Sequence, residues 1–338
     1  MSILIKLIFA GVFATTLVLS PAVSAQTEDV VKFGQLRVPN AFFIGIEKGT
    51  FERYGIDAQP VFFRSGAELA AQLIGGHIDA GGTTPGATLF NALAGGTKAK
   101  VVGDYAVFGE SRSPNWIVIR KDLADSGAVT QISDLKGRTI AITARGQVTH
   151  LFIGRLLERG GLSEKDVRLV TLSYPDMLAA FEGKAIAAAP FIEPLGTIAD
   201  RRGLITHFLD TRELMPELSL LVLVYSERLT TDQRELGHRF MKGWHEANLI
   251  FRELDKTAQG RKDAAEIFQK YVPAEDGEIY EEIPYYLGRT DLVVNIEGKN
   301  GLRDQFDWYR DQGLIPNPPE LNVIVDNEFA FEAQRDAE

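Results

Sequence analysis

The sequence contains no cysteine, and this absence removes several kinds of chemistry at once. Disulfides, thiolate metal sites, a cysteine nucleophile and a lipid anchor on cysteine are all excluded. Histidine is scarce as well, and the five residues show neither an H-E-x-x-H motif nor any other metal-ligand spacing. We therefore predict no metal site and no cofactor.

Positive charge is in the minority. The chain carries 36 Lys and Arg against 46 Asp and Glu, a formal net charge of −10. No stretch rich in Lys and Arg is present to meet a phosphate backbone, so we expect no nucleic-acid partner. A small anion is still a possible ligand, because a single cation or helix end binds one whatever the net charge.

Long apolar runs are missing too, except within the first 25 residues. There, Lys6 is the only charge, an apolar run extends from Leu7 to Ser20, and the small residues Val23-Ser24-Ala25 follow. This pattern predicts a secretory signal peptide at 1–25, cleaved after Ala25. A membrane anchor is the alternative, but a run of about 14 residues is short for a bilayer span of about 20.

The rest of the chain alternates short apolar runs with helical patterns, which is typical of an α/β protein with largely parallel sheets. Two such series follow each other with no flexible linker between them. We therefore predict two lobes, each a mostly parallel sheet flanked by helices, with two crossing strands as a hinge. The crossings are expected near Tyr105–Ser113 and Leu218–Ser226. The predicted ranges are 30–108 for the first part of lobe I, 109–221 for lobe II, and 222–338 for the return to lobe I and the C-terminal helices.

Small polar residues follow several predicted strands at their carboxyl ends, where ligands bind in open α/β sheets. Such residues cap helices and leave backbone N–H groups facing a ligand. Capping alone explains any single turn, but several at matching strand ends indicate a ligand site. The candidates are Asn40 after the first strand, Ser65 and Gly66 after the second, Thr83 and Thr84 after the third, and Gly146, Gln147 and Thr149 in lobe II, with Thr149 expected to cap a helix that begins near His150.

Arg145 and His150 belong to the same lobe II turn. Arg145 is either a cation for a carboxylate or sulfonate, or a solvated loop side chain. His150 would act as a base only beside a nucleophile, and no Ser lies in a G-x-S-x-G pattern. We therefore predict no catalytic residue and interpret His150 as a ligand-facing or capping side chain.

Aromatic residues gather near the predicted cleft, namely Phe42, Phe43, Tyr105, Phe108 and Trp116. Rings at such positions are usually part of the core, but they also form walls for an apolar ligand body. Three of these rings, Phe42, Phe43 and Trp116, together with Arg145 suggest a carboxylate or sulfonate whose body is apolar or aromatic.

Several motifs, in order and spacing, carry a resemblance to a known family. They are K-G-x-F-x-x-x-G-I at Lys48–Ile56, Ser65-Gly66 at a helix start, G-x-I-D-x-G at Gly76–Gly81, "ISDLKGRTIAI" from Ile132, and G-x-x-x-H at Gly146–His150. Residues 30–225 thereby resemble the solute-binding proteins of ABC importers for nitrate, sulfonates and taurine. Two positions depart from the family pattern: Ala187-Ala188, where an Asp before Ala is typical, and Arg145.

The resemblance implies a two-lobe, type II periplasmic binding fold, in which closure of the lobes traps a ligand. The closed form would then dock transiently on an inner-membrane permease. The expected ligand is a small organic anion, and the expected state is a monomer in the periplasm. The alternatives are a periplasmic sensor of the same fold, or an enzyme like the thiamine-pyrimidine-synthesis proteins, against which the signal peptide and the missing cysteine argue. Binding loops are implied at Asn40–Phe43, Ser65-Gly66, Thr83–Pro85, Gly146–His150 and Glu193.

Overall fold

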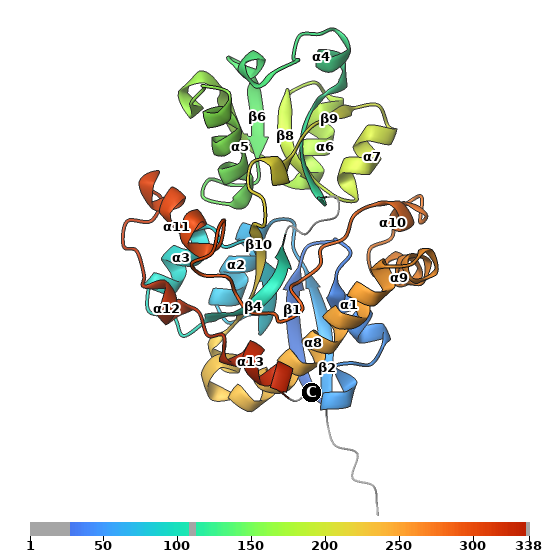
Figure 1. Ribbon diagram of the computed structural model, residues 1–338, viewed down its shortest axis with the longest axis vertical. Coiled ribbons are helices and arrows are strands. Elements are labelled where there is room, and N and C mark those ends of the chain that lie inside the picture. The colour runs from blue at the N-terminus through green and yellow to red at the C-terminus, as the bar shows by residue number, and fades with distance from the viewer. Residues whose placement is uncertain (1–27, 108–112, 336–338) are drawn as a thin grey trace, which may run out of the picture.

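The computed structural model describes residues 28–107 and 113–335, which form two lobes arranged along the long axis (Figure 1). The predicted signal peptide, 1–25, lies outside the described residues. Among the helices of these two ranges, none combines the length and the apolar character that a bilayer span requires.

Lobe I contains a five-stranded sheet with the order β2-β1-β3-β10-β4. Strand β10 runs antiparallel to both of its neighbours, while β1 is parallel to β2 and β3, so four strands point the same way. These strands are β1 (Asp29–Gln35), β2 (Ile56–Phe62), β3 (Ala80–Thr83), β4 (Lys100–Val107) and β10 (Ser219–Tyr225).

Lobe II repeats this arrangement with the order β7-β6-β8-β5-β9, and here β5 is the reversed strand. The prediction of two mostly parallel sheets is therefore confirmed, with one reversed strand in each. The strands are β5 (Asn115–Arg120), β6 (Thr139–Ile142), β7 (Arg168–Thr171), β8 (Ala188–Ile192) and β9 (Ile205–Asp210).

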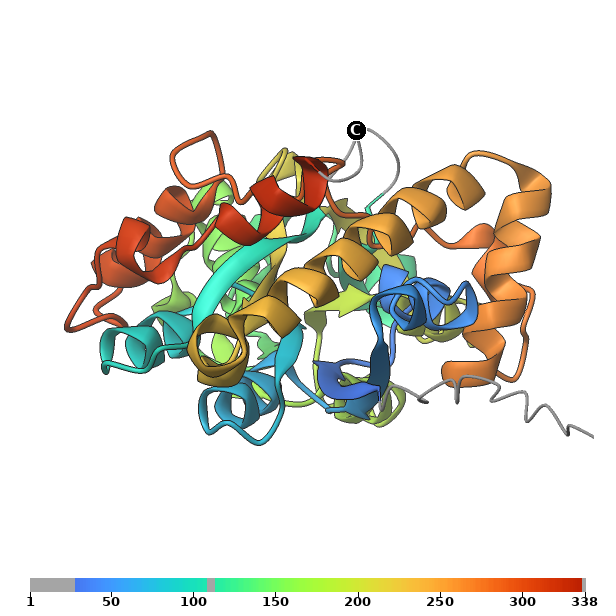
Figure 2. The same ribbon diagram turned by 90° about the horizontal axis from the view of Figure 1, so that it is seen from below.

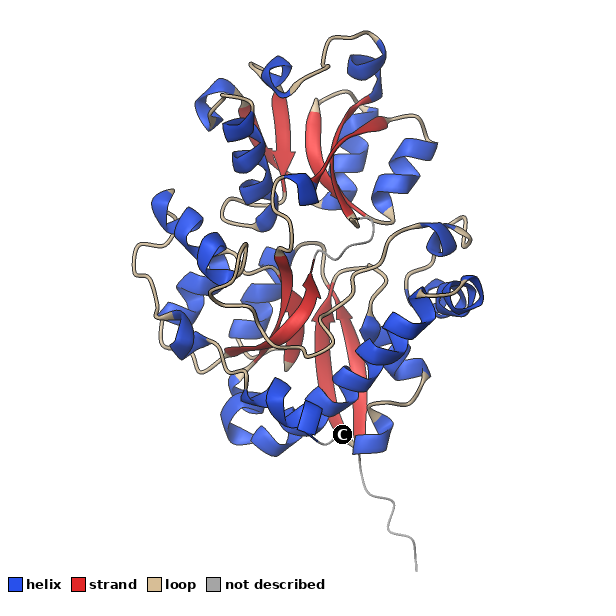
Figure 3. Ribbon diagram, in the orientation of Figure 1, coloured by secondary structure: helices blue, strands red, loops and turns tan. Residues whose placement is uncertain are grey.

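Helices flank both sheets (Figure 3). Lobe I carries α1 (Ala41–Glu47), α2 (Gly66–Ile74), α3 (Ala87–Ala94) and α8 (Arg234–Asp255), and lobe II carries α4 (Lys121–Asp125), α5 (Val148–Arg159), α6 (Tyr174–Glu182) and α7 (Leu195–Arg201). The C-terminal part adds α9 (Ala258–Tyr271), α10 (Ile279–Glu282), α11 (Leu302–Asp311), α12 (Leu321–Ile324) and α13 (Glu328–Arg335). Short turns of helix are η1 (Glu52–Tyr54), η2 (Ile132–Leu135), η3 (Glu164–Asp166), η4 (Thr211–Glu213) and the π turn η5 (Arg228–Asp232).

Aromatic rings fill the core of lobe I between the sheet and α8, which crosses the lobe with α13 beside it (Figure 2). Phe33 on β1 stacks on Phe42 of α1 with 4.3 Å between ring centroids, and it lies 5.3 Å from the Trp244 ring of α8. Tyr105 on β4 lies 5.0 Å from the same Trp244 ring. Because each ring removes a large apolar area from water, this cluster fixes α1 and α8 against the sheet.

The chain returns from lobe II to lobe I between β9 and β10. Strand β10 lies wholly in the lobe I sheet, so this crossing precedes Ser219. The predicted crossing at Leu218–Ser226 was therefore placed slightly too far along the chain. Beside it, the buried carboxylate of Asp104 on β4 accepts a hydrogen bond from Ser219 Oγ at 3.1 Å and from the Arg289 backbone N–H at 3.4 Å.

Helix α11 connects the two lobes outside the hinge. It is held on lobe I by Phe306, whose ring meets Phe90 of α3 edge-on at 5.1 Å. On lobe II, the ring of Trp308 packs against Gly154 in α5, and its Nε1–H donates to Glu158 Oε1 at 3.3 Å. The C-terminal helices thus make an interlobe contact of their own.

Candidate functional site

The carboxyl ends of the parallel strands in the two lobes face one another (Figure 1). Strands β1, β2 and β3 of lobe I end at Gln35, Phe62 and Thr83, and β6 and β8 of lobe II end at Ile142 and Ile192. The loops that follow these ends lie between the lobes. This is the position at which ligands bind in open α/β sheets.

The predicted polar turns of the two lobes are in direct contact. Thr84 Oγ1 donates to Gln147 Oε1 at 2.5 Å, and the Ala87 backbone N–H donates to the Gly146 carbonyl at 2.7 Å. Gly66, at the start of α2, lies beside Thr83, Thr84 and Gln147. The structure therefore brings together the lobe I and lobe II residues that the sequence placed on opposite walls of a cleft.

Two buried amide groups keep an unused donor, that of Gln147 at this contact and that of Gln35 at the end of β1. The side chains of Gln35 and Gln147 are 1% and 3% exposed, and neither Nε2 has a hydrogen-bond partner in the described residues. A buried amide N–H without an acceptor is costly, so an acceptor on a ligand would be favourable at either position.

Asn40 and Ser65 act as helix caps. Asn40 is completely buried: its Oδ1 accepts from the Phe42 N–H at 2.9 Å, and its Nδ2 donates to Gln35 Oε1 and the Val38 carbonyl. Ser65 Oγ accepts from the Glu68 N–H at 3.3 Å. Because both Nδ2 protons are donated and the side chain is completely buried, Asn40 shapes the loop after β1 from behind.

The predicted aromatic wall is not where the sequence placed it. Phe42 and Phe43 are both fully buried in the core of lobe I, where Phe43 stacks on Tyr271 of α9 at 4.7 Å. Trp116 is half-buried in the lobe II sheet, with its ring edge-on to His207 at 4.8 Å. Phe42 and Phe43 therefore belong to the core of lobe I, and none of the three rings lines the interlobe cavity described below.

Arg145 and His150 both contact Glu164 in η3. Arg145 Nη1 donates to Glu164 Oε2 at 2.8 Å, and His150 Nε2 contacts the other carboxylate oxygen. Burial alone would raise the pKa of Glu164, but hydrogen bonds and charges from these two residues hold it below its usual range. Arg145 therefore serves a local ion pair, and the hypothesis that it contacts ligand is not supported.

His150 supports the turn from behind, which agrees with the capping alternative. Its ring is 1% exposed, and its Nδ1 accepts from the Gly146 backbone N–H at 3.1 Å. Gly146 has a positive φ of 75°, as the predicted tight turn requires. Thr149 was expected to cap α5, and this was wrong: α5 begins at Val148 after Gln147, and Thr149 Oγ1 instead accepts from the Thr143 N–H at 2.9 Å.

Glu193 directly follows β8 and is also a capping residue. It is 3% exposed, and its Oε2 accepts from the Thr197 N–H at 3.0 Å in the first turn of α7. A carboxylate at this helix start is favourable, since the N-terminal end of a helix carries partial positive charge.

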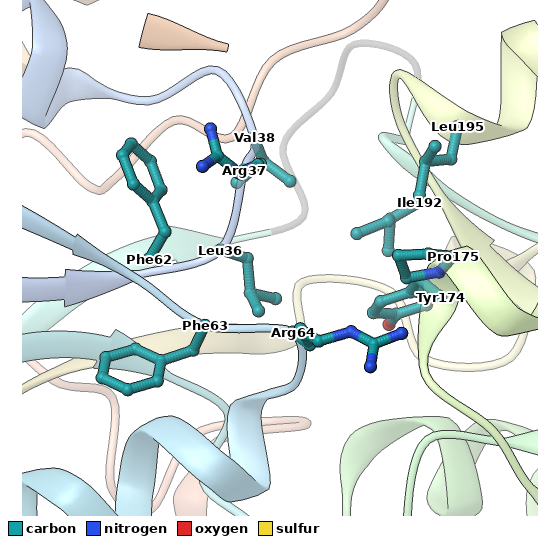
Figure 4. Close-up of a pocket in the computed structure, with 10 residues that line it drawn as sticks. All are labelled: Leu36, Arg37, Val38, Phe62, Phe63, Arg64, Tyr174, Pro175, Ile192 and Leu195. Carbon is teal, nitrogen blue, oxygen red and sulfur yellow. The ribbon is translucent and has the colours of Figure 1, made fainter.

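A cavity of about 380 Å³ opens between the lobes, lined by residues other than the polar turns described above (Figure 4). Its size lies within the usual range for small-molecule sites, about 300–1,000 Å³. Lobe I contributes the loops after β1 and β2, and lobe II contributes the start of α6 and the loop after β8. Figure 4 shows Arg64 extending from the end of β2 toward Tyr174 and Pro175. The lining residues are Leu36, Arg37, Val38, Phe62, Phe63, Arg64, Tyr174, Pro175, Ile192 and Leu195.

A comparison with known families matches residues 31–269 to the sequence model of the NMT1-like family. The chain belongs to the NMT1-like family. A putative binding protein of Brucella abortus, BAB2_1146, is 30% identical over 158 residues, which is 46% of this chain. The match spans 45%, or about half, of the length of that relative.

Solved structures share the fold of this NMT1-like protein at low sequence identity. The ligand-binding component of an ABC-type import system from Staphylococcus aureus, with zinc bound, has a TM-score of 0.74 and 17% identity, covering 91% of this chain and 100% of its own. The alkanesulfonate-binding protein SsuA from Xanthomonas axonopodis pv. citri, bound to MOPS, has a TM-score of 0.70 and 18% identity, with 89% and 97% covered. The nitrate-binding protein NrtA from Synechocystis PCC 6803 has a TM-score of 0.74 and 15% identity, covering 92% of this chain and 89% of its own. The desulfurization enzyme DszB has a TM-score of 0.60 and 15% identity, covering 92% of this chain and 100% of its own.

Two cavity residues of this NMT1-like protein, Arg37 and Arg64, were not predicted as site residues from the sequence. Gln35 of β1 pairs in register with Phe62 of β2, and each arginine follows its strand end by two residues. The two arginines therefore follow neighbouring strands at the same edge of the sheet. An Arg two residues beyond each of two neighbouring strands was the available signal.

A metal centre is not formed by the described part of this NMT1-like protein. Within residues 28–107 and 113–335, no group of three or more His, Asp and Glu side chains is placed to hold a metal ion.

Proposed function

We propose that this protein is the solute-binding component of an ABC importer and that it binds a small organic anion between its lobes. The observation that carries the proposal is an interlobe cavity with apolar walls from both lobes and two guanidiniums, those of Arg37 and Arg64. A ligand that touches both walls binds the closed arrangement better than an open one, so it shifts the lobes toward closure.

The comparisons support uptake over catalysis. The Staphylococcus protein that shares this fold is the ligand-binding component of an ABC-type import system, and SsuA and NrtA are an alkanesulfonate-binding and a nitrate-binding protein. The Brucella relatives are described as putative binding proteins. The desulfurization enzyme shows that the fold also carries chemistry. In this chain, however, the candidate base His150 is engaged by Gly146 and Glu164 and faces no hydroxyl nucleophile among the described residues. We place the protein in the periplasm, where its closed form would dock on an inner-membrane permease.

Calorimetric titration of the mature protein tests this function. The panel comprises alkanesulfonates, taurine, nitrate and aromatic carboxylates, with a neutral sugar and zinc as further arms. We expect heat of binding, and a rise in melting temperature, with at least one organic anion, because a ligand specific for the native state stabilises it. Binding only to a neutral or cationic solute, or to zinc alone, would contradict the proposal.

A further inference from the structure

The two arginines of the cavity are engaged in different ways. Arg64 reaches across to lobe II, where its Nη2 donates to Asp176 Oδ1 at 2.9 Å and to Ser173 Oγ at 3.3 Å. Arg37 stays on lobe I, with its guanidinium carbon 4.2 Å from the centre of the Phe62 ring. Among the carboxylates of residues 28–107 and 113–335, none pairs with Arg37.

The stacking of Arg37 on Phe62 prepares its guanidinium for an anion. A guanidinium is planar, and its N–H donors point outward within that plane. When one face lies on an aromatic ring, the orientation of the plane is fixed while the donors at its edge stay free. Less side-chain entropy is then lost when an acidic group binds.

The remaining walls of the cavity are apolar and come from both lobes. A small inorganic anion such as nitrate would leave these walls uncovered, whereas a ligand with a hydrocarbon body would remove them from water. Burial raises the pKa of the Tyr174 phenol, so this ring adds no charge to the lobe II side of the cavity. The apolar wall residues are Leu36, Val38, Phe62 and Phe63 from lobe I and Pro175, Ile192 and Leu195 from lobe II.

We infer that Arg37 binds the acidic group of an amphipathic anion whose alkyl or aryl body fills the space between the two apolar walls. Arg37 then sets the preference for an anion over a neutral molecule of the same shape, while Arg64 holds the lobes together through Asp176. The inference rests on the proposed function and deepens it, because it favours sulfonates and carboxylates with an apolar body over nitrate and over taurine, which carries an ammonium group.

The test compares the affinity of the wild type and of Arg37 variants for charged ligands and for neutral ligands of the same shape. Octanesulfonate and benzenesulfonate are titrated into the mature protein alongside their neutral amides, octanesulfonamide and benzenesulfonamide. We expect Arg37→Met to weaken the sulfonates about 10- to 100-fold, as for the loss of a hydrogen bond to a charged group, and to leave the amides nearly unchanged. Arg37→Lys keeps the positive charge but lacks the planar guanidinium, so it should lose less sulfonate affinity than Arg37→Met does.

Arg145→Met is the matched control, because it removes the same charge from a side chain that is paired with Glu164 outside the cavity. It should leave all four affinities within about twofold, since its effect is limited to a screened long-range charge. Circular dichroism of each variant verifies folding, and Arg37 is an exposed side chain whose loss does not open the core.

The outcomes separate this inference from the function on which it rests. An unchanged preference for the sulfonates in Arg37→Met would overturn the role of Arg37 while the importer function stands. Binding of taurine or nitrate without either apolar sulfonate would overturn the ligand class alone. Failure of the wild type to bind any anion of the wider panel would overturn the function itself.

Discussion

The contact between Gly154 and Trp308 allows a sharp test of how the C-terminal helices join the lobes. A Cβ atom on Gly154 would lie 2.3 Å from Trp308 Cζ2 and 3.1 Å from Cη2. Gly154→Ala therefore cannot be accommodated unless the Trp308 ring moves out of its place on α5. The same substitution removes a glycine from the middle of a helix, which by itself is favourable.

These two effects differ in sign and can be separated. Replacing a mid-helix Gly by Ala stabilises by about 1 kcal/mol, while overpacking a buried site costs about 1–3 kcal/mol. We expect Gly154→Ala alone to lower the free energy of unfolding by about 1 kcal/mol. Trp308 is 5% exposed, so Trp308→Ala alone should cost about 3 kcal/mol. In the Trp308→Ala background the clash is gone, and Gly154→Ala should then stabilise by about 1 kcal/mol.

Urea unfolding of the wild type, both single variants and the double variant, followed by circular dichroism, measures this coupling. We expect an interaction energy of about 2 kcal/mol between the two positions. If the effects of Gly154→Ala and Trp308→Ala on the free energy of unfolding add within about 0.5 kcal/mol, the predicted clash between the alanine and the Trp308 ring is refuted. Small-angle scattering of the unliganded variants would show whether loss of the contact lets the lobes separate.

Three further perturbations follow from single residues. Burial raises the pKa of Asp104 to about 7, so the free energy of unfolding should fall as pH rises from about 4 to about 7. Asp104→Asn should therefore stabilise the protein at pH 8 by about 2–4 kcal/mol, measured by urea unfolding. An equal pH dependence in the variant and the wild type would contradict this. Asn40→Ala removes the cap on the Phe42 N–H and should cost about 1–2 kcal/mol in the same assay, whereas no loss would mean that α1 needs no cap. Burial lowers the pKa of His150 against the opposing pull of Glu164, so its neutral ring stabilises above about pH 6.5 and this contribution is lost as pH falls; His150→Gln should flatten that acid limb of the stability curve.

The alternation of strands and helices and the polar turns could be predicted because both are local features of the sequence. Hydrophobic period, glycine stops and capping residues are read within a few positions. The meeting of Thr84 with Gln147 also followed from local features, since it needs only that two sheets point their strand ends at each other. The contacts within each turn were harder to predict: Thr149 was expected at the N-cap of α5, but Gln147 occupies that position.

The misplaced residues all depend on partners far away in the chain. Phe43 is taken up by Tyr271 of α9, which no local pattern links to α1. Arg145 is neutralised by Glu164, which lies beyond the whole of α5. Arg37 becomes recognisable only once the pairing of β1 with β2 is known, because that pairing brings the loop after β1 next to the end of β2, where Arg37 meets Phe62. Contacts between residues distant in the sequence therefore decide which charged or aromatic side chain remains available to a ligand.

The position of β10 has a consequence for how the protein folds. This strand lies between β3 and β4, and Val222 pairs with both Thr83 and Asp104, yet the entire chain of lobe II is made before it. The lobe I sheet therefore cannot form its central pairing until lobe II has already been synthesised, while lobe II is built from one uninterrupted stretch. We expect lobe II to acquire structure first and lobe I to fold late and slowly, because contacts distant in sequence slow folding. Hydrogen-exchange labelling during refolding would show this as earlier protection of β6 and β8 than of β3 and β4.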